Sequence, residues 1–149
     1  MLKQGFLYFM MIAFLPILGC QKDVDGFNPQ TGGSGVITAS INGSPWAAPD
    51  GYVEDQPPFG LRLRGVNGSN SEINLIISPY DGLGQYALNG ITSVEYREGG
   101  DIYQSISGQI TITSNTQESV EGHFQCEMVS SSAGLSLSVT QGQFLIPRY

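Results

Sequence analysis

From residue 36 onward, apolar and polar residues alternate in short runs rich in Ile, Val, Leu, Tyr and Thr, and Gly, Asn, Asp and Pro separate these runs. Alternation with a period of two is typical of β-strands that bury one face, and no long stretch has the apolar spacing of a helix. The pattern predicts strands over residues 36–42, 59–66, 72–78, 84–89, 92–97, 101–105, 107–114, 117–129 and 135–147.

The turns between these runs indicate how the strands are connected. Asn-Gly and Asp-Gly pairs, which accept positive φ and favour tight hairpins, occur at 42–43, 50–51, 67–68, 81–82 and 89–90. Strands at this spacing without helical connections predict one all-β domain, a single antiparallel β-sandwich or flattened barrel of about eight to nine strands. One face of the sheet should be wet, because Arg62 and Arg64 alternate with leucines.

The last predicted strand changes phase partway along. Its apolar positions are odd-numbered up to Val139, whereas Phe144 and Ile146 are even-numbered. A change of phase within one strand requires an extra residue, so we expect a β-bulge near Gln141 and Gly142. The glycine would supply backbone freedom at that point.

The first 35 residues follow a different pattern. Lys3 is the only charge before an uncharged apolar run from Phe6 to Leu18, which is shorter than the roughly 20 residues of a transmembrane helix. A basic start, a short apolar run and a small residue are typical of a secretory signal peptide. Here the small residue is Gly19, and a cysteine, Cys20, follows it.

The segment ending in Gly19-Cys20 resembles the signal of bacterial lipoproteins. The resemblance implies cleavage after Gly19 and attachment of lipid to the Cys20 thiol, since a thiolate is the nucleophile that this modification needs. The alternative is an ordinary signal peptide that happens to precede a cysteine. The residues that follow resemble the short acidic export signal of Bacteroidota-type surface lipoproteins, and they are Gln21, Lys22, Asp23 and Asp25.

These features divide the chain into three parts. Residues 1–19 are expected to be a lipoprotein signal peptide, residues 20–35 the lipidated cysteine with a flexible Gly/Ser-rich tether, and residues 36–149 the all-β domain. We expect the membrane to be a partner of the mature chain, which would be held there by the lipid anchor on Cys20. The expected location is the outer membrane with display at the cell surface, and the alternative is a lipoprotein that faces the periplasm.

Charge narrows the classes of partner. After cleavage five Lys and Arg face thirteen Asp and Glu, which gives a net charge of about −8. This balance disfavours nucleic acid and anionic headgroups, because both need clustered basic side chains. The four arginines are spread along the sequence and predict no basic stripe; they are Arg62, Arg64, Arg97 and Arg148.

The residues offer little for catalysis or metal binding. His123, the single histidine, is predicted on a wet face, and a Ser-His-Asp triad would depend on it. The second cysteine, Cys126, lies two residues after the apolar Phe124, so both side chains should point into the core. With one histidine and a buried cysteine, the sequence lacks the three or four ligands that a zinc site needs. No cofactor is expected. A carboxylate pair could hydrolyse a glycosidic bond, and its candidates, among which spacing selects no pair, are Glu54, Asp55, Glu95, Glu98 and Asp101.

Aromatic residues near predicted loops are the candidates for ligand binding. Trp46, Tyr96 and Tyr103, together with Asp101, could form an exposed platform for a sugar or a protein partner. The alternative is that these rings cap the two ends of the core. For Trp46 that alternative is favoured, because the segment 45–49 has the character of a plug across an open end.

Three segments carry a resemblance to a family: Ile41–Trp46, Val120–Phe124 and Thr140–Phe144. Together they are similar to an uncharacterised family of Bacteroidota-type lipoproteins, over residues 36–147. The resemblance implies a β-rich domain and transfers no catalytic residue. We expect a non-enzymatic, surface-anchored module that binds a glycan or protein partner or serves as an envelope assembly subunit. The alternative is an envelope hydrolase with a carboxylate pair, such as a glycoside hydrolase.

Overall fold

The computed structural model describes residues 35–56, 60–132 and 134–148, and this part of the chain consists of strands and turns without a helix. Nine strands follow one another along it. They are β1 (Gly35–Ile41), β2 (Ser44–Gln56), β3 (Gly60–Val66), β4 (Glu72–Ile77), β5 (Gly84–Ala87), β6 (Ser93–Glu98), β7 (Asp101–Asn115), β8 (Ser119–Ser130) and β9 (Ser136–Pro147).

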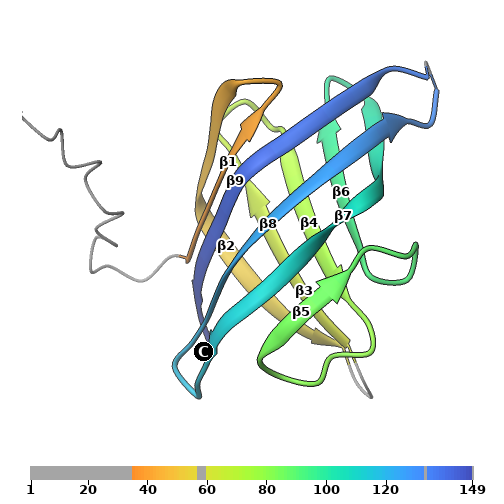
Figure 1. The fold of residues 1–149 in the computed structure, drawn as a ribbon. Coiled ribbons are helices and arrows are strands. Elements are labelled where there is room, and N and C mark those ends of the chain that lie inside the picture. The colour runs from red at the N-terminus through yellow and green to blue at the C-terminus, as the bar shows by residue number, and fades with distance from the viewer. Residues whose placement is uncertain (1–34, 57–59, 133, 149) are drawn as a thin grey trace, which may run out of the picture.

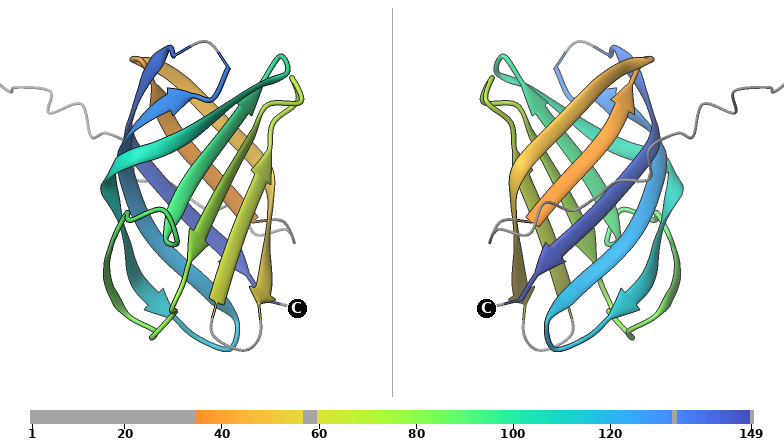
Figure 2. Two further views of the ribbon diagram at one scale, coloured as in Figure 1. Left: turned by 90° about the vertical axis from the view of Figure 1, so that its right-hand side faces the viewer. Right: turned by 90° about the vertical axis from the view of Figure 1, so that its left-hand side faces the viewer.

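The strands form one antiparallel sheet that closes on itself (Figure 1). The order around the ring is β7-β6-β4-β3-β2-β1-β9-β8, and β8 pairs back with β7. Strand β5 lies outside this ring and pairs with β7 alone among the described strands. The views from the two sides show the strands inclined to the axis of the closed sheet (Figure 2), as closure requires. The all-β prediction is confirmed, in its barrel form.

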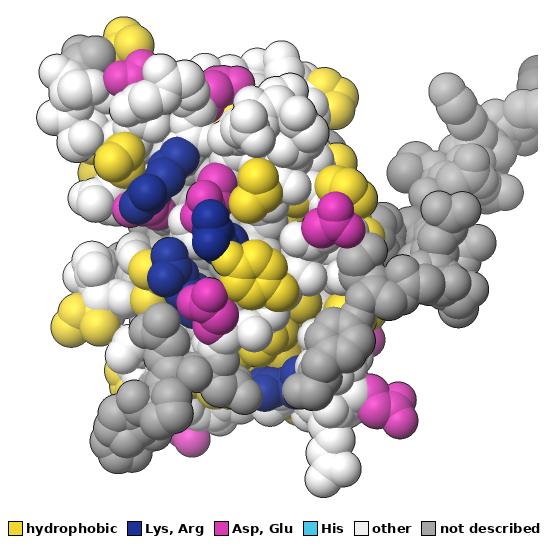
Figure 3. Space-filling view, turned by 180° about the vertical axis from the view of Figure 1, so that it is seen from behind, with side chains coloured by type: hydrophobic (Ala, Val, Ile, Leu, Met, Phe, Trp, Pro, Cys, Tyr) yellow, Lys and Arg dark blue, Asp and Glu magenta, His cyan; other side chains and the backbone are white. Residues whose placement is uncertain are grey.

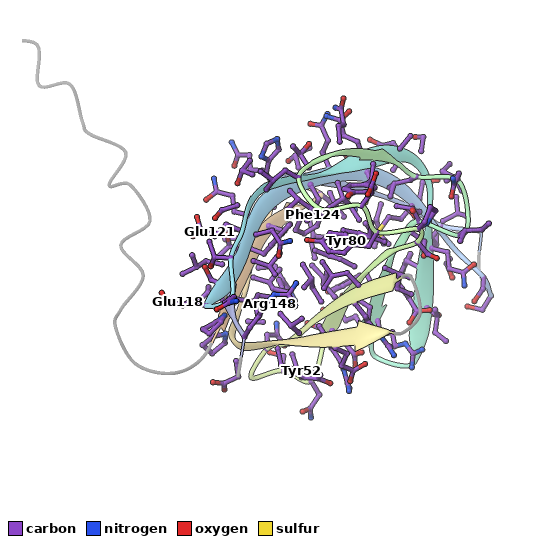
Figure 4. All side chains as sticks on the ribbon, turned by 90° about the horizontal axis from the view of Figure 1, so that it is seen from below. Tyr52, Tyr80, Glu118, Glu121, Phe124 and Arg148 are labelled. Atoms are coloured by element: carbon purple, nitrogen blue, oxygen red, sulfur yellow. The ribbon has the colours of Figure 1, made fainter. Side chains whose placement is uncertain are left out.

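The alternation of side chains follows the pleat of the barrel, with apolar residues inside and polar residues outside. Strand β3 alternates strictly, with Leu61 and Leu63 fully buried and the arginines between them facing outward. Viewed from below, Tyr80 and Phe124 point into the barrel, whereas Tyr52 lies outside it (Figure 4). Each fully buried aliphatic side chain contributes about 1.5–3 kcal/mol to folding, so this filled interior is the main source of stability.

Strand β2 was not predicted. Its segment contains Pro45, Pro49 and an Asp-Gly pair, which together indicated a plug and a turn. In the structure Pro45 is the second residue of the strand. The register between β1 and β2 shifts between the pair Ile37–Ala48 and the pair Gly35–Gly51, so that Pro49 lies at a bulge. Strand ends and bulges tolerate proline because its missing N–H breaks no ladder hydrogen bond there. The turn expected at 50–51 is therefore wrong, whereas the Asn42-Gly43 hairpin forms with positive φ at both residues.

Two other irregularities concern β7 and β9. The strands expected at 101–105 and 107–114 are one strand, β7, with a register shift between Ser105 and Ser107. The bulge predicted in the last strand is confirmed, because Phe124 faces Gly142 while Cys126 faces Val139. The positive φ belongs to Gln141, at 53°, and not to the glycine beside it.

The predicted signal peptide, Cys20 and the export-signal residues Gln21, Lys22, Asp23 and Asp25 lie outside the described residues. The described strands and turns contain no helix that could span a membrane.

Candidate binding face

The three aromatic residues singled out in the sequence lie together inside one end of the barrel. Trp46, Tyr96 and Tyr103 are 7%, 2% and 8% exposed. Trp46 meets the Tyr96 ring edge to face at 6.4 Å, and its indole N–H donates a 2.7 Å hydrogen bond to Ser71 Oγ. Burial raises the pKa of the Tyr96 phenol. The rings therefore cap the core, as the alternative interpretation expected, and do not form an exposed platform.

The candidate carboxylates do not converge. Asp101 accepts a 2.9 Å hydrogen bond from Ser132 Oγ, and Glu98 faces Asp101 across the exposed turn between β6 and β7. The Asp55 side chain lies outside the described residues. Glu54 and Glu95 each pair with an arginine on the outside of the barrel. Neither depression described below is lined by any of these five residues.

The outer surface of β2, β3, β4 and β6 carries three arginines and three glutamates, which are visible from behind as mixed blue and magenta side chains (Figure 3). We call this surface the charge-paired face. The expectation that the arginines are scattered is wrong for three of them, because the sheet brings them together. The charges alternate in sign, however, so the face is no basic stripe. Its members are Tyr52, Glu54, Arg62, Arg64, Glu72, Asn74, Glu95 and Arg97.

Polar groups on the charge-paired face bind one another. Arg64 contacts both carboxylate oxygens of Glu72, at 2.7 and 2.8 Å, and also donates to the hydroxyl of Tyr52. Asn74, which is fully buried although it points outward, accepts a hydrogen bond from Arg62 at 3.3 Å and donates to Glu72. Burial alone would raise the pKa of Glu72, but the hydrogen bonds from Arg64 and Asn74 prevail and lower it. The charged side chains of this face are therefore paired with one another, although Nε of Arg62 has no hydrogen-bond partner among the described residues.

The other broad surface, over β7, β8, β9 and β1, has a different chemistry. Most of its outward side chains are amides, hydroxyls and one imidazole, with Glu121, Glu127 and Leu145 also pointing outward, and we call it the amide face. One row crosses five strands in register, because Thr111 faces His123, His123 faces Gln143, and Gln143 faces Thr38, which in turn faces Ala47. The members of the face are Thr38, Ser40, Gln109, Thr111, His123, Gln125, Thr140, Gln141 and Gln143.

Side chains of the amide face have no hydrogen-bonding partner among the described residues. Each glutamine amide carries two donor hydrogens and an acceptor oxygen, and each hydroxyl is both donor and acceptor. His123 is exposed, as the sequence predicted, and it shares its strand and side of the barrel with Glu121 and Gln125. The amide face therefore presents a dense set of donors and acceptors that are directed to the solvent.

Two depressions mark this face. The first, about 360 Å³, lies among Thr113, Glu121, His123 and Gln143, with Gly122 also in its lining. The second, about 550 Å³, is lined by residues that include Thr38, Trp46, Gln141 and Gln143. Gln143 lines both, so the two depressions are neighbours along the row described above. Trp46 reaches the second one with only a small part of its surface.

Backbone irregularities coincide with the depressions. Thr113 is the extra residue where the β7–β8 register shifts between Ile112 and Ser114, and it lines the first depression. Gln141 has a positive φ of 53° in the β9 bulge and lines the second. Bulges redirect side chains and occur preferentially beside functional sites, and positive φ in a non-glycine residue is a form of local strain that is also enriched there.

The glutamines of this face were not among the predicted site residues. The signal was present, because the outward positions of the last two strands carry Gln125, Gln141 and Gln143 where charged residues are the usual choice. No group of three His, Cys, Asp or Glu side chains that could hold a metal ion occurs in the residues the structure describes.

Comparison with known proteins places the domain in a family. A family model described as a domain of unknown function, DUF6252, matches residues 33–146, which include all nine strands except the last residue of β9. No curated protein and no solved structure matches the chain.

Proposed function

The chain belongs to the DUF6252 family, a domain of unknown function, and on this premise we propose that it is a lipid-anchored envelope protein whose barrel is a non-enzymatic binding module. The amide face is the proposed binding surface. The lipid on Cys20 would hold the barrel at the outer membrane, displayed on the cell surface, with the periplasmic side as the alternative.

One observation carries the choice of face. The charged side chains of the charge-paired face are bound to one another, whereas the amide face leaves its donors and acceptors unpaired over two adjoining depressions. A ligand at the charge-paired face would have to break ion pairs that already exist. A ligand at the amide face would only replace water. The second face is therefore the one at which binding is favourable.

The lipid anchor has support from the second cysteine. Cys126 is 4% exposed in the barrel interior, and burial raises the pKa of its thiol to about 12. A buried, protonated thiol is a poor partner for disulfide exchange, so Cys126 leaves Cys20 without an intramolecular disulfide. Cys20 is then available for lipid, as its position after the apolar run and Gly19 indicates.

The anchor is tested by growing cells that express the full chain with an alkyne-labelled fatty acid and detecting the label on the purified protein. We expect label on the wild type and on Cys126→Ala, and none on Cys20→Ala. Cys126→Ala is the matched control because it removes the only other thiol. Label that persists in Cys20→Ala would contradict the anchor, and protease digestion of intact cells would separate surface display from a periplasmic location.

A further inference from the structure

We propose that the ligand of the amide face is a neutral, linear polysaccharide that lies across the strands with its centre at Gln143. This inference rests on the proposed function, because it names the ligand of the same face.

Charge argues for a neutral ligand. The amide face carries no arginine or lysine, and two carboxylates lie on its strands: Glu121 lines the first depression, and Glu127 accepts a 2.9 Å hydrogen bond from Ser138 Oγ. The chain as a whole has a formal charge of −7. A polyanion would be repelled by this field, and Glu121, the one carboxylate among the residues that line the two depressions, offers a polycation no cluster of opposite charges.

The hydrogen-bonding groups match hydroxyls. Amides and hydroxyls offer donors and acceptors side by side, and a sugar hydroxyl likewise donates one hydrogen bond and accepts others. The row from Thr111 through His123 and Gln143 to Thr38 places such a group on each of four adjacent strands. A polyhydroxylated chain can satisfy all of them in turn, whereas an apolar ligand would leave them without partners at a cost of about 1–3 kcal/mol for each buried group.

A protein partner fits the face less well. Protein interfaces are centred on buried aromatic, aliphatic or arginine anchors. The large hydrophobic side chains that the barrel exposes are Leu83, Ile91, Ile106 and Leu135, and none of them lines either depression. The aromatic residues that line the depressions, Phe144 in the first and Trp46 in the second, are only 3% and 7% exposed, so the described part of the face presents no exposed aromatic or arginine anchor.

The length of the row indicates a polymer and not a single sugar. Adjacent strands are about 4.8 Å apart, so the four hydrogen-bonding members of the row, on four strands, extend over about 14 Å. The repeat of a pyranose in an extended chain is of the same order as the strand spacing. A chain that crosses the strands could therefore place about one sugar over each of these four strands, which gives about four sugars along the row. Because Gln143 lines both depressions, it would contact the middle of this chain.

The test is isothermal titration calorimetry on the purified full chain, in a detergent without a sugar headgroup. The probes are neutral β-linked gluco-, xylo- and manno-oligosaccharides of one to six units and the neutral polysaccharide fraction of the host envelope. The variants are Gln143→Ala and, as a matched control, Gln104→Ala, which removes an exposed amide from β7 at a position facing Glu95 of the charge-paired face.

We expect affinity to rise with length up to about four units and then to level off, because further sugars extend beyond the row. Gln143→Ala should weaken binding of the longest probe at least tenfold, and Gln104→Ala should change it less than twofold. Affinity that is complete with one sugar, or that responds equally to both variants, would overturn the inference.

A second arm separates failure of this inference from failure of the proposed function. Envelope extract is passed over immobilised wild type and Gln143→Ala, before and after protease or periodate treatment. Retention that depends on Gln143 and is lost with protease but not with periodate would overturn the polysaccharide while leaving the amide face as a binding surface. Absence of any Gln143-dependent binding in both arms would overturn both.

Discussion

Among the glycines of the amide-face strands, Gly122 is the one at which an added Cβ would make the shortest contact. A Cβ atom at this position would lie 2.0 Å from the carbonyl oxygen of Thr111 and 2.5 Å from Cζ of Phe144. The Phe144 ring could shift within the core, but the oxygen belongs to the backbone of β7, which pairs with β8 along its length. The β7–β8 ladder would therefore have to separate locally to admit even a methyl group.

The magnitude follows from this geometry. Overpacking of a well-packed site typically costs about 1–3 kcal/mol, and a clash with backbone belongs at the upper end because no side-chain rotation relieves it. We expect Gly122→Ala to lower the free energy of unfolding by about 3 kcal/mol. For a barrel of this size, with about 4 °C of Tm per kcal/mol, the melting temperature should fall by about 12 °C.

Thermal unfolding followed by far-ultraviolet circular dichroism measures this effect. The control is Gly68→Ala, since a Cβ at Gly68 meets nothing within 4 Å and that glycine lies in the exposed turn between β3 and β4. Its Tm should stay within about 2 °C of the wild type, because a compatible Gly→Ala change costs little and restricts the unfolded chain. Equal melting temperatures for the two variants would refute the packing derived for the β7–β8 ladder.

Three further predictions concern other parts of the barrel. The pKa of Glu72 is lowered in the folded state, so its contribution to stability is present above the unfolded pKa and is lost as pH falls through the folded value. Glu72→Gln should therefore flatten the loss of Tm between roughly pH 5 and pH 2, which is the window of a paired carboxylate. An unchanged dependence of Tm on pH in this variant would contradict the pairing of Glu72 with Arg64. Cys126 should resist maleimide at pH 8 in the folded chain and react once guanidinium unfolds it, because the thiol is buried with a pKa of about 12; rapid labelling without denaturant would show that the thiol is accessible. Trp46→Phe should cost about 1–3 kcal/mol in urea unfolding, since it leaves the buried Ser71 hydroxyl without its 2.7 Å partner, and a loss below about 0.5 kcal/mol would contradict that bond.

The fold was predictable because one face of nearly every strand is buried. Where apolar and polar residues alternate, as in Leu61–Arg64, the pleat follows directly from the sequence. The bulge in β9 was predictable for the same reason, because an extra residue is the only way to move both Val139 and Phe144 into the core.

The incorrect or open predictions concern features of the sheet that are determined by the pairing between strands and not by the local sequence. Pro45 and Pro49 are strong signals against a strand, yet a strand end and a bulge accommodate them in β2. The choice between sandwich and barrel depends on the pairing of β1 with β9, which joins segments about 100 residues apart and has no local signature.

The candidate site was less predictable than the fold. Aromatic residues near predicted loops suggested a binding platform, but loop proximity in sequence does not reveal the side of the sheet, and Tyr96 and Tyr103 point inward. The glutamines of the amide face are common residues without a motif. Their meaning depends on cross-strand register, which places Gln143 between His123 and Thr38 and cannot be read from three separate strands.

The most direct test of the amide face is to observe its side-chain amides while the ligand binds. The side-chain N–H resonances of Gln125, Gln141 and Gln143 are assigned in the ¹⁵N-labelled full chain, along with that of Gln104, and the neutral polysaccharide fraction of the envelope is added. We predict saturable shifts at the first three resonances and none at Gln104. Shifts confined to Gln104 and the charge-paired face, or no shift at any of the four amides, would contradict the central claim that this protein binds its ligand at the amide face.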